Sequence, residues 1–548
     1  MNNVAGDYIT GYEEPGAHIL LISFPKVTTM LSTVAKIARI LPYVDGASWN
    51  PKLTCLSNTR ETILRIISSW ANATDLSRVF WLKGLVGSGK SAIAHTIAQA
   101  LAKRGLLGSS FFFNRDIPSR NTAKMLISTI ARDLANAHPA IKRDIARLLE
   151  DEPALATAAL TRQFQELILG PLTRHPIHRP FVVVIDALDE SIDNEDLDST
   201  LLSILGDEAH KLPPYFRIFV TSRPMRHIED FLSGKDHVVS HSIDIRSAEN
   251  LRDVAAYIDF QLQDKSITEA NGPDEMQIRE LKRLAEGLFI WIATIFNYLR
   301  TAYNPQAKLN ALLSGSMQQG LPPEKKMDGL YASILQASGD WMDEDFVRDY
   351  DVVIGTIMAA KRPLSLAAIQ ALHSENQSLT PKLLLERFGS VLTGFHHTQE
   401  PIRILHLSFR EFITVRANKA ATTQHFYVSE KAHSSRLASL CLKTINRDLA
   451  VSTPGTGYLS KEQDDIRGIP NISGVSEQLL YCCEFCSDHV TDVENPIAVR
   501  DDIRQMVSHH LMTCMEIVTS ASVFRGSLTL RRWWKVSKFP ALQKQIRG

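Results

Sequence analysis

Residues 78–97 have the sequence RVFWLK-GLVGSGKS-AIAHTI, in which an apolar run leads into a glycine-rich loop and then into an amphipathic stretch. The pattern G-x-x-x-x-G-K-S between a strand and a helix predicts a phosphate-binding loop. Glycines let successive backbone N–H groups point inward at phosphate oxygens. The helix that follows adds its free N–H groups and the positive end of its dipole.

The positions of this loop have separate expected roles. Lys90 is expected to reach the β- and γ-phosphates, and the Ser91 hydroxyl is expected to bind Mg²⁺. The other contacts are expected from the loop and the first helical turn, namely from Gly84, Gly87, Ser88, Gly89 and Ala92.

A second apolar run ends in acidic residues, with the sequence FVVVIDALDE at residues 181–190. Ligands of parallel sheets lie at the carboxyl ends of strands, so Asp186 is expected beside the phosphate loop, holding Mg²⁺ directly or through water. Asp189 or Glu190 is expected to orient the attacking water. The alternative for these trailing acids is a solvated loop.

A third apolar run, residues 217–221, leads into Ser222 and Arg223. Thr221 or Arg223 is expected to contact the γ-phosphate, because a cation there would stabilise the terminal charge. The alternative is that Arg223 pairs with nearby carboxylates.

Composition limits the class of protein. The chain has 548 residues, enough for about three or four domains, and its 60 basic and 60 acidic residues give a formal net charge of zero. Charge therefore gives no evidence for nucleic acid or membrane as a partner. The six cysteines are sparse, no run approaches about 20 apolar residues, and no secretory leader is evident. We expect a cytoplasmic protein without a transmembrane segment.

The pattern along the chain predicts five segments. Strands are expected at 79–83, 109–113, 181–185, 217–221 and 238–243, alternating with helices such as 92–102, 122–135 and 140–149. The predicted fold class is α/β, a P-loop NTPase with a parallel sheet. The expected segments are a short N-terminal helical segment at 1–45, the NTPase core at 46–250, a helical lid at 251–320, a winged-helix domain at 321–420 and a helical C-terminal region without recognisable repeats at 421–548.

With these motifs in place, residues 46–490 resemble the NACHT family of STAND-type NTPases, closest to fungal NOD-like receptors with a nephrocystin-type N-terminal NTPase domain. Besides the loop, the resemblance rests on several short motifs, which are CLSNTR at 55–60, FFFNRD at 111–116, DALDE at 186–190, TSRP at 221–224, EGLFIW at 286–291 and LHLSFREF at 405–412.

The resemblance implies a signalling switch that is closed with ADP, opens on exchange to ATP and then forms homo-oligomers. Slow Mg²⁺-dependent hydrolysis, an unknown protein effector and a role in innate-immunity-like or self/non-self recognition are further implications; GTP is the alternative nucleotide. In relatives, His406 corresponds to a histidine that contacts the ADP β-phosphate, whereas its surroundings alone indicate a core histidine. Thr59 and Arg60 correspond to a region near the adenine.

Two features depart from the family pattern. Phe289 stands where relatives often carry a proline against the base, and no sensor repeats follow the helical region. Two other functions stay open, namely an efficient motor-type ATPase and a scaffold with permanently bound nucleotide.

Three weaker patterns have structural alternatives. A helix at residues 27–41 is expected to pack on its neighbour domain, the alternative being a membrane or partner helix. Cysteines and a histidine at 482–489 suggest zinc, but they crowd one helix and indicate a buried helix face. The basic and aromatic residues at 531–535 suggest lipid or nucleic acid, but an aromatic packing anchor is the favoured interpretation.

Overall fold

The structure is a computed structural model of the chain. It describes residues 37, 40–191, 195–268, 272–300, 302–314, 320–375, 379–451, 453–458 and 472–521. The expected helix at 27–41 falls largely outside the described residues, and the basic aromatic patch at 531–535 falls entirely outside them.

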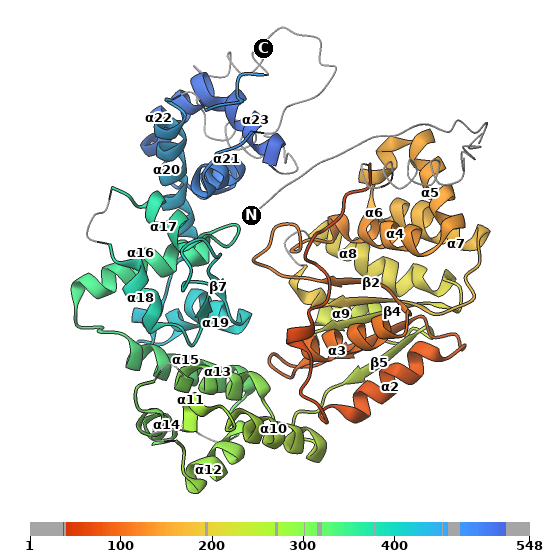
Figure 1. The fold of residues 1–548 in the computed structure, drawn as a ribbon, viewed down its shortest axis with the longest axis horizontal. Helices are drawn as coiled ribbons and strands as arrows, with labels where there is room; N and C mark the ends of the chain where they lie inside the picture. The colour runs from red at the N-terminus through yellow and green to blue at the C-terminus, as the bar shows by residue number, and fades with distance from the viewer. Residues whose placement is uncertain are drawn as a thin grey trace, which may run out of the picture.

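A five-stranded parallel sheet forms the core of the N-terminal half (Figure 1). Its strand order is β2-β3-β4-β1-β5, with the bounds β1 Val79–Lys83, β2 Leu107–Phe112, β3 Phe181–Asp186, β4 Phe216–Ser222 and β5 Val238–Ser242. Strands β1, β3 and β4 are almost wholly buried. Their continuous apolar sequences are those of strands covered on both faces. The predicted α/β class with a parallel sheet is therefore confirmed, with strand ends within two residues of those expected.

Helices cover both faces of this sheet. One face packs against α2 (Glu61–Asn72) and α3 (Lys90–Lys103), whose apolar side chains form one core with Phe80 and Phe219. The other face is covered by a second core that includes α4 Leu126–Ala137, α5 Pro139–Asp151, α6 Leu160–Gln163, α7 Gly170–Arg174, α8 Glu195–Ser203 and α9 Arg226–Leu232. The loop after β1 and the acidic residues at the end of β3 lie at the carboxyl ends of the strands, which is where ligands of such sheets bind.

The chain beyond the sheet is largely helical. The first group of helices comprises α10 Ala248–Gln261, α11 Lys265–Thr268, α12 Glu275–Ala285, α13 Phe289–Arg300 and α14 Pro305–Ser314. The apolar residues across 281–296 are divided between α12 and α13, because the chain turns at Glu286 and Gly287, which have φ angles of 46° and 82°. This corner directs the N-terminus of α13 back toward the sheet.

A second group of elements lies in residues 321–420, the segment expected to form a winged-helix domain. Its helices and strands are α15 Pro323–Ser338, α16 Glu344–Ala359, α17 Leu366–Leu372, α18 Pro381–Arg387, β6 Leu392–Thr393, β7 Arg403–Ile404 and α19 Leu407–Glu411. Strands β6 and β7 pair antiparallel over two residues each, so the hairpin is short. Helices followed by a hairpin is the order expected for a winged helix.

The last described helices are α20 Glu430–Asp448, α21 Glu477–Val490, α22 Arg500–Gln505 and α23 Leu511–Ala521. They share one apolar core with all helices from α10 onward. Cys482 and Cys486 are buried in α21 and form part of this core. Among the described residues, no helix has the length and apolar character needed to cross a membrane.

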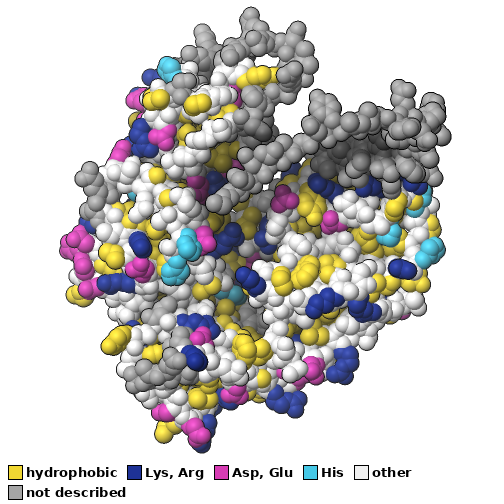
Figure 2. All heavy atoms as spheres, viewed as in Figure 1, with side chains coloured by type: hydrophobic (Ala, Val, Ile, Leu, Met, Phe, Trp, Pro, Cys, Tyr) yellow, Lys and Arg dark blue, Asp and Glu magenta, His cyan; other side chains and the backbone are white. Residues whose placement is uncertain are grey.

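The helical half curves around the sheet domain (Figure 1). In the space-filling view a hollow separates the two halves, and Lys and Arg side chains lie on its walls (Figure 2). The loops at the carboxyl ends of the strands contact the helical half at α13 and α19.

Candidate functional site

The predicted phosphate loop connects β1 to α3. Gly87 and Gly89 have φ angles of 73° and 88°, a left-handed conformation that glycine adopts without strain. Gly87 has a second constraint, because a Cβ atom there would lie 1.9 Å from Cγ2 of Ile290 at the start of α13. The Ile290 N–H also donates to the Gly87 carbonyl at 3.4 Å. The loop is thus packed directly against the predicted lid.

Lys90 folds back over the loop that precedes it. Its Nζ donates to the Gly84 carbonyl at 2.8 Å and to the Leu85 carbonyl at 3.1 Å. Burial lowers the pKa of Lys90, while the carboxylates of Asp189 and Asp186 raise it. The ammonium group therefore lies at the loop, within the field of the acidic residues after β3.

Ser88 is the buried polar residue of the loop. Its side chain has no exposed surface, and its hydroxyl has no hydrogen-bond partner in the part of the chain that the structure describes. A buried hydroxyl without a partner is costly. This orphaned donor fits a loop that closes on the oxygens of a ligand.

Asp186 ends β3 and is 3% exposed. Strand β4 lies between β3 and β1, and its Thr221 hydroxyl donates to Asp186 at 2.5 Å while accepting the Ala187 N–H at 3.0 Å. Burial raises the pKa of Asp186, and hydrogen bonds from Thr221 and Ser91 oppose this. The Ser91 hydroxyl and the Asp186 carboxylate thus lie together, and such oxygen ligands suit Mg²⁺.

The two acidic residues that follow have different surroundings. Asp189 accepts the Arg223 N–H at 3.1 Å and its Nε–H at 3.0 Å. Glu190 accepts a backbone N–H from Arg115 at 3.3 Å, and burial together with the charge of Asp189 raises its pKa to about 7. Asp189 is paired with a cation, whereas the carboxyl group of Glu190 has a pKa close to neutral pH.

Arg223 pairs with two carboxylates that are distant from each other in sequence. Its Nε contacts Asp189, and its Nη1 donates to Glu411 of α19 at 2.9 Å. Arg223 thus pairs with carboxylates, as in the alternative interpretation of the sequence, and one of these carboxylates belongs to the helical half. Glu411 lies in the motif at 405–412, but no local pattern in the sequence indicated that it pairs with Arg223.

Arg60 lies over the loop from the other side. Its backbone is left-handed, with φ 61°, and its N–H donates to Asp253 of α10 at 3.0 Å. Its Nη2 donates to the Ser88 carbonyl at 2.5 Å, and its guanidinium lies 4.7 Å from the centre of the Phe289 ring. Phe289, the departure from the family pattern, therefore stacks on Arg60. Thr59 is buried and donates to the Leu56 carbonyl.

His406 lies at the N-terminus of α19, where its Nδ1 accepts the Ser408 N–H at 3.1 Å. Because a backbone N–H can only donate, the neutral ring carries its proton on Nε2. Burial and the charges of Arg223 and Lys90 lower the pKa of His406 to about 4. A neutral imidazole with a donor at Nε2 thus lies in the field of the phosphate-loop lysine.

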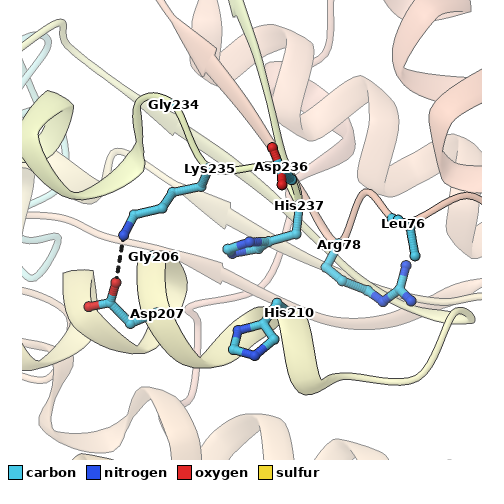
Figure 3. Close-up of a pocket in the computed structure, with 9 residues that line it drawn as sticks. All are labelled: Leu76, Arg78, Gly206, Asp207, His210, Gly234, Lys235, Asp236 and His237. Atoms are coloured by element: carbon cyan, nitrogen blue, oxygen red, sulfur yellow. Dashed lines mark hydrogen bonds and ion pairs between the residues drawn. The ribbon is translucent and has the colours of Figure 1, made fainter.

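A pocket of about 560 Å³ lies at the opposite edge of the sheet, where β1 and β5 begin (Figure 3). Four of its polar side chains, those of Arg78, Asp207, Lys235 and His237, bind one another or the backbone. Lys235 pairs with Asp207 at 2.7 Å, His237 Nε2 lies 3.0 Å from the Leu205 carbonyl, and Arg78 Nε donates to the Leu212 carbonyl at 2.7 Å. This pocket is separate from the phosphate loop.

One family model and several solved structures match this chain. The family model described as Nephrocystin 3, N-terminal, matches residues 58–223. A STAND protein with a tetratricopeptide repeat sensor from Pyrococcus horikoshii is 15% identical, with a TM-score of 0.38; the match covers 93% of this chain and 66%, just under two thirds, of that chain.

Two further solved structures have lower TM-scores. A Walker-type ATPase of Pyrococcus abyssi is 15% identical, with a TM-score of 0.29, over 64% of this chain and 95% of that one. The Drosophila ORC bound to DNA is 11% identical, with a TM-score of 0.28, over 98% and 86%. No curated protein matches the chain significantly.

The parallel sheet and the loop between β1 and α3 define a P-loop NTPase fold. Residues 58–223 match the model of the nephrocystin-3 N-terminal domain, a NACHT-type domain. A P-loop NTPase domain of this kind implies nucleotide binding. The individual roles of the site residues stay predictions.

Proposed function

We propose that this chain is a nucleotide-controlled switch that is closed with ADP and opens on exchange to ATP. The observation that carries the proposal is that two distant helices contact the phosphate-loop side of the sheet, α13 through Ile290 and α19 through Glu411. A ligand bound between such elements shifts their equilibrium by its differential affinity for the two states. Opening would then expose surfaces for self-association.

The proposed ligand contacts follow the predicted assignment. The N–H groups of the loop and of Ala92 would hold the phosphates, and Lys90 would exchange its two carbonyl partners for phosphate oxygens. Ser91 and Asp186 would hold Mg²⁺, which neutralises phosphate charge when it is bound. Arg60 and Thr59 would lie near the base, with the Phe289 ring beside them.

Slow hydrolysis is part of the same proposal. Glu190 is the favoured residue to orient the attacking water, because it has no cation partner in the described residues while Asp189 pairs with Arg223. Arg223 would stabilise the terminal phosphate only after leaving its carboxylates. That requirement supports a switch over an efficient motor.

His406 would sense the diphosphate in the closed state. Its Nε2 carries the proton and has no hydrogen-bond partner among the described residues, so it could donate to a β-phosphate oxygen. A role in self/non-self signalling remains a prediction from the family resemblance.

The experiment that tests the proposal identifies the nucleotide that copurifies with the full chain and measures particle mass before and after addition of Mg·ATP. A switch predicts stoichiometric ADP in the smaller species and a larger species after exchange, which Lys90→Ala should not form. Rapid multiple turnover without a mass change would support the motor alternative. Bound nucleotide that does not exchange would support the scaffold.

A further inference from the structure

We propose that Glu411 is a positioning residue that withholds Arg223 from the terminal phosphate, so that the helical half controls the response to ATP and not only the closed shape. The inference rests on the proposed nucleotide switch and deepens it. It assigns to one carboxylate of α19 a part in discriminating ATP from ADP.

The geometry of Arg223 is the first support. Its guanidinium is shared between Asp189 at 3.0 Å and Glu411 at 2.9 Å, and the three side chains are 21%, 7% and 22% exposed, in the order Arg223, Asp189 and Glu411. Charge-assisted contacts of this kind are about twice as strong as neutral hydrogen bonds. The Arg223 guanidinium can therefore bind either these two carboxylates or the phosphate oxygens of a nucleotide.

The position of Arg223 is the second support. Arg223 directly follows β4, whose Thr221 hydroxyl donates to Asp186 at the carboxyl end of the sheet. In keeping with this position, the charge of Arg223 lowers the pKa of both Lys90 and His406. A terminal phosphate bound by Lys90 would compete with Glu411 for the same guanidinium. ADP lacks that phosphate and would leave the Arg223–Glu411 pair in place.

Glu411 is itself held in place from behind. Its second oxygen lies 3.2 Å from Nη1 of Arg416, and Arg416 Nε lies 2.8 Å from Asp328 of α15. Charges thus alternate from Asp189 through Arg223, Glu411 and Arg416 to Asp328. Loss of the Arg223 contact would change the charge balance of two helices in the helical half.

The neighbouring residue of α19 provides a matched control. Arg410 also pairs with the sheet domain, through Asp116 in the loop after β2, and additionally with Glu430. Both pairs connect the same helix to the sheet domain, but only the Glu411 pair engages a residue predicted to contact the terminal phosphate. Variants that break one pair or the other therefore distinguish two effects, a general loosening of the interface and a specific release of Arg223.

The experiment measures Kd for Mg·ADP and for a non-hydrolysable Mg·ATP analogue in the full chain and in the variants Glu411→Gln and Asp116→Asn. We expect Glu411→Gln to increase the affinity for the ATP analogue relative to ADP by about 3- to 10-fold, as for one half-buried ion pair. Asp116→Asn should change both affinities by the same factor.

A double-mutant cycle and a milder variant complete the test. In Arg223→Gln the added Glu411→Gln change should no longer alter the ratio of the two affinities. Glu411→Asp, whose shorter side chain retracts from Arg223, should shift the ratio in the same direction by less, and it serves if Glu411→Gln does not fold.

An unchanged ratio in Glu411→Gln and Glu411→Asp, or an equal shift in Asp116→Asn, would overturn the role of Glu411. That failure differs from failure of the switch itself. If nucleotide binding did not depend on Lys90, the proposed function would fail before Glu411 became relevant.

Discussion

Three residues of the site have roles that single substitutions can separate. Lys90 lies on the loop carbonyls, Asp186 lies beside the Ser91 hydroxyl, and Glu190 has a carboxyl group whose pKa is raised to about 7. These groups share one edge of the sheet but different chemistry. Each therefore predicts a different measurement.

Lys90→Ala should abolish nucleotide binding, because a charge-assisted contact to phosphate in a preorganised site typically contributes several kcal/mol. Titration with a fluorescent ADP analogue measures the loss. Lys83→Ala is a suitable control, since Lys83 ends β1, the strand that leads into the phosphate loop, but pairs with Glu229 at 3.4 Å. Unchanged ADP affinity in Lys90→Ala would refute the phosphate-loop assignment.

Asp186→Asn should weaken binding with Mg²⁺ more than binding of ADP in the presence of a chelator. The amide keeps an acceptor for the Thr221 hydroxyl but removes the charge that would hold the cation. The two affinities are compared in one titration series. Equal losses with and without Mg²⁺ would mean that Asp186 acts structurally.

Glu190 predicts a pH dependence of stability. Its pKa is raised from 4.5 to about 7 in the folded chain, so the unfolded state loses the proton first and rising pH favours unfolding across this range. In nucleotide-free protein without Mg²⁺, Glu190→Gln should therefore gain thermal stability over the parent from pH 5 to pH 8. Allowing for partial solvent screening, the gain is about 1–2 kcal/mol. A melting-temperature difference independent of pH would contradict this.

The contacts of the helices α13 and α19 with the sheet domain could not be predicted from the sequence. The loop and strands were predictable because their signals are local, namely glycine spacing and continuous apolar runs. Ile290 against Gly87, and Glu411 against Arg223, are contacts between distant parts of the chain with no local pattern. The order of β4 between β1 and β3, which brings Thr221 to Asp186, was likewise not readable from strand patterns.

His406→Ala tests the contribution of α19 to the closed state. If Nε2 donates to the ADP β-phosphate, the variant should release ADP faster, by about 1–3 kcal/mol of lost interaction, with its fold retained. Stopped-flow ADP release and the melting temperature are measured side by side. A lower melting temperature with an unchanged ADP off-rate would instead make His406 a core residue that supports Ser408.

At the scale of the whole molecule, the proposed exchange should alter overall dimensions. A compact chain of this length has a radius of gyration of about 24 Å. Separation of α13 and α19 from the sheet domain should raise this value when ADP is replaced by a non-hydrolysable ATP analogue. Small-angle scattering coupled to size exclusion measures the monomer fraction. An identical radius with both nucleotides would argue against opening, and Lys90→Ala should show no response.

The strand order has a consequence for how the chain is made. Strand β1, which leads into the phosphate loop, pairs on one side with β4 and on the other with β5, and both are translated long after it. Pairing across such sequence separations is slow, because the closure entropy of the intervening chain is lost before the contacts form. On the ribosome, β1 therefore cannot pair with its neighbouring strands until residues 216–242 have emerged, and its apolar side chains stay exposed until then. This interval is when the nascent chain most needs protection by chaperones.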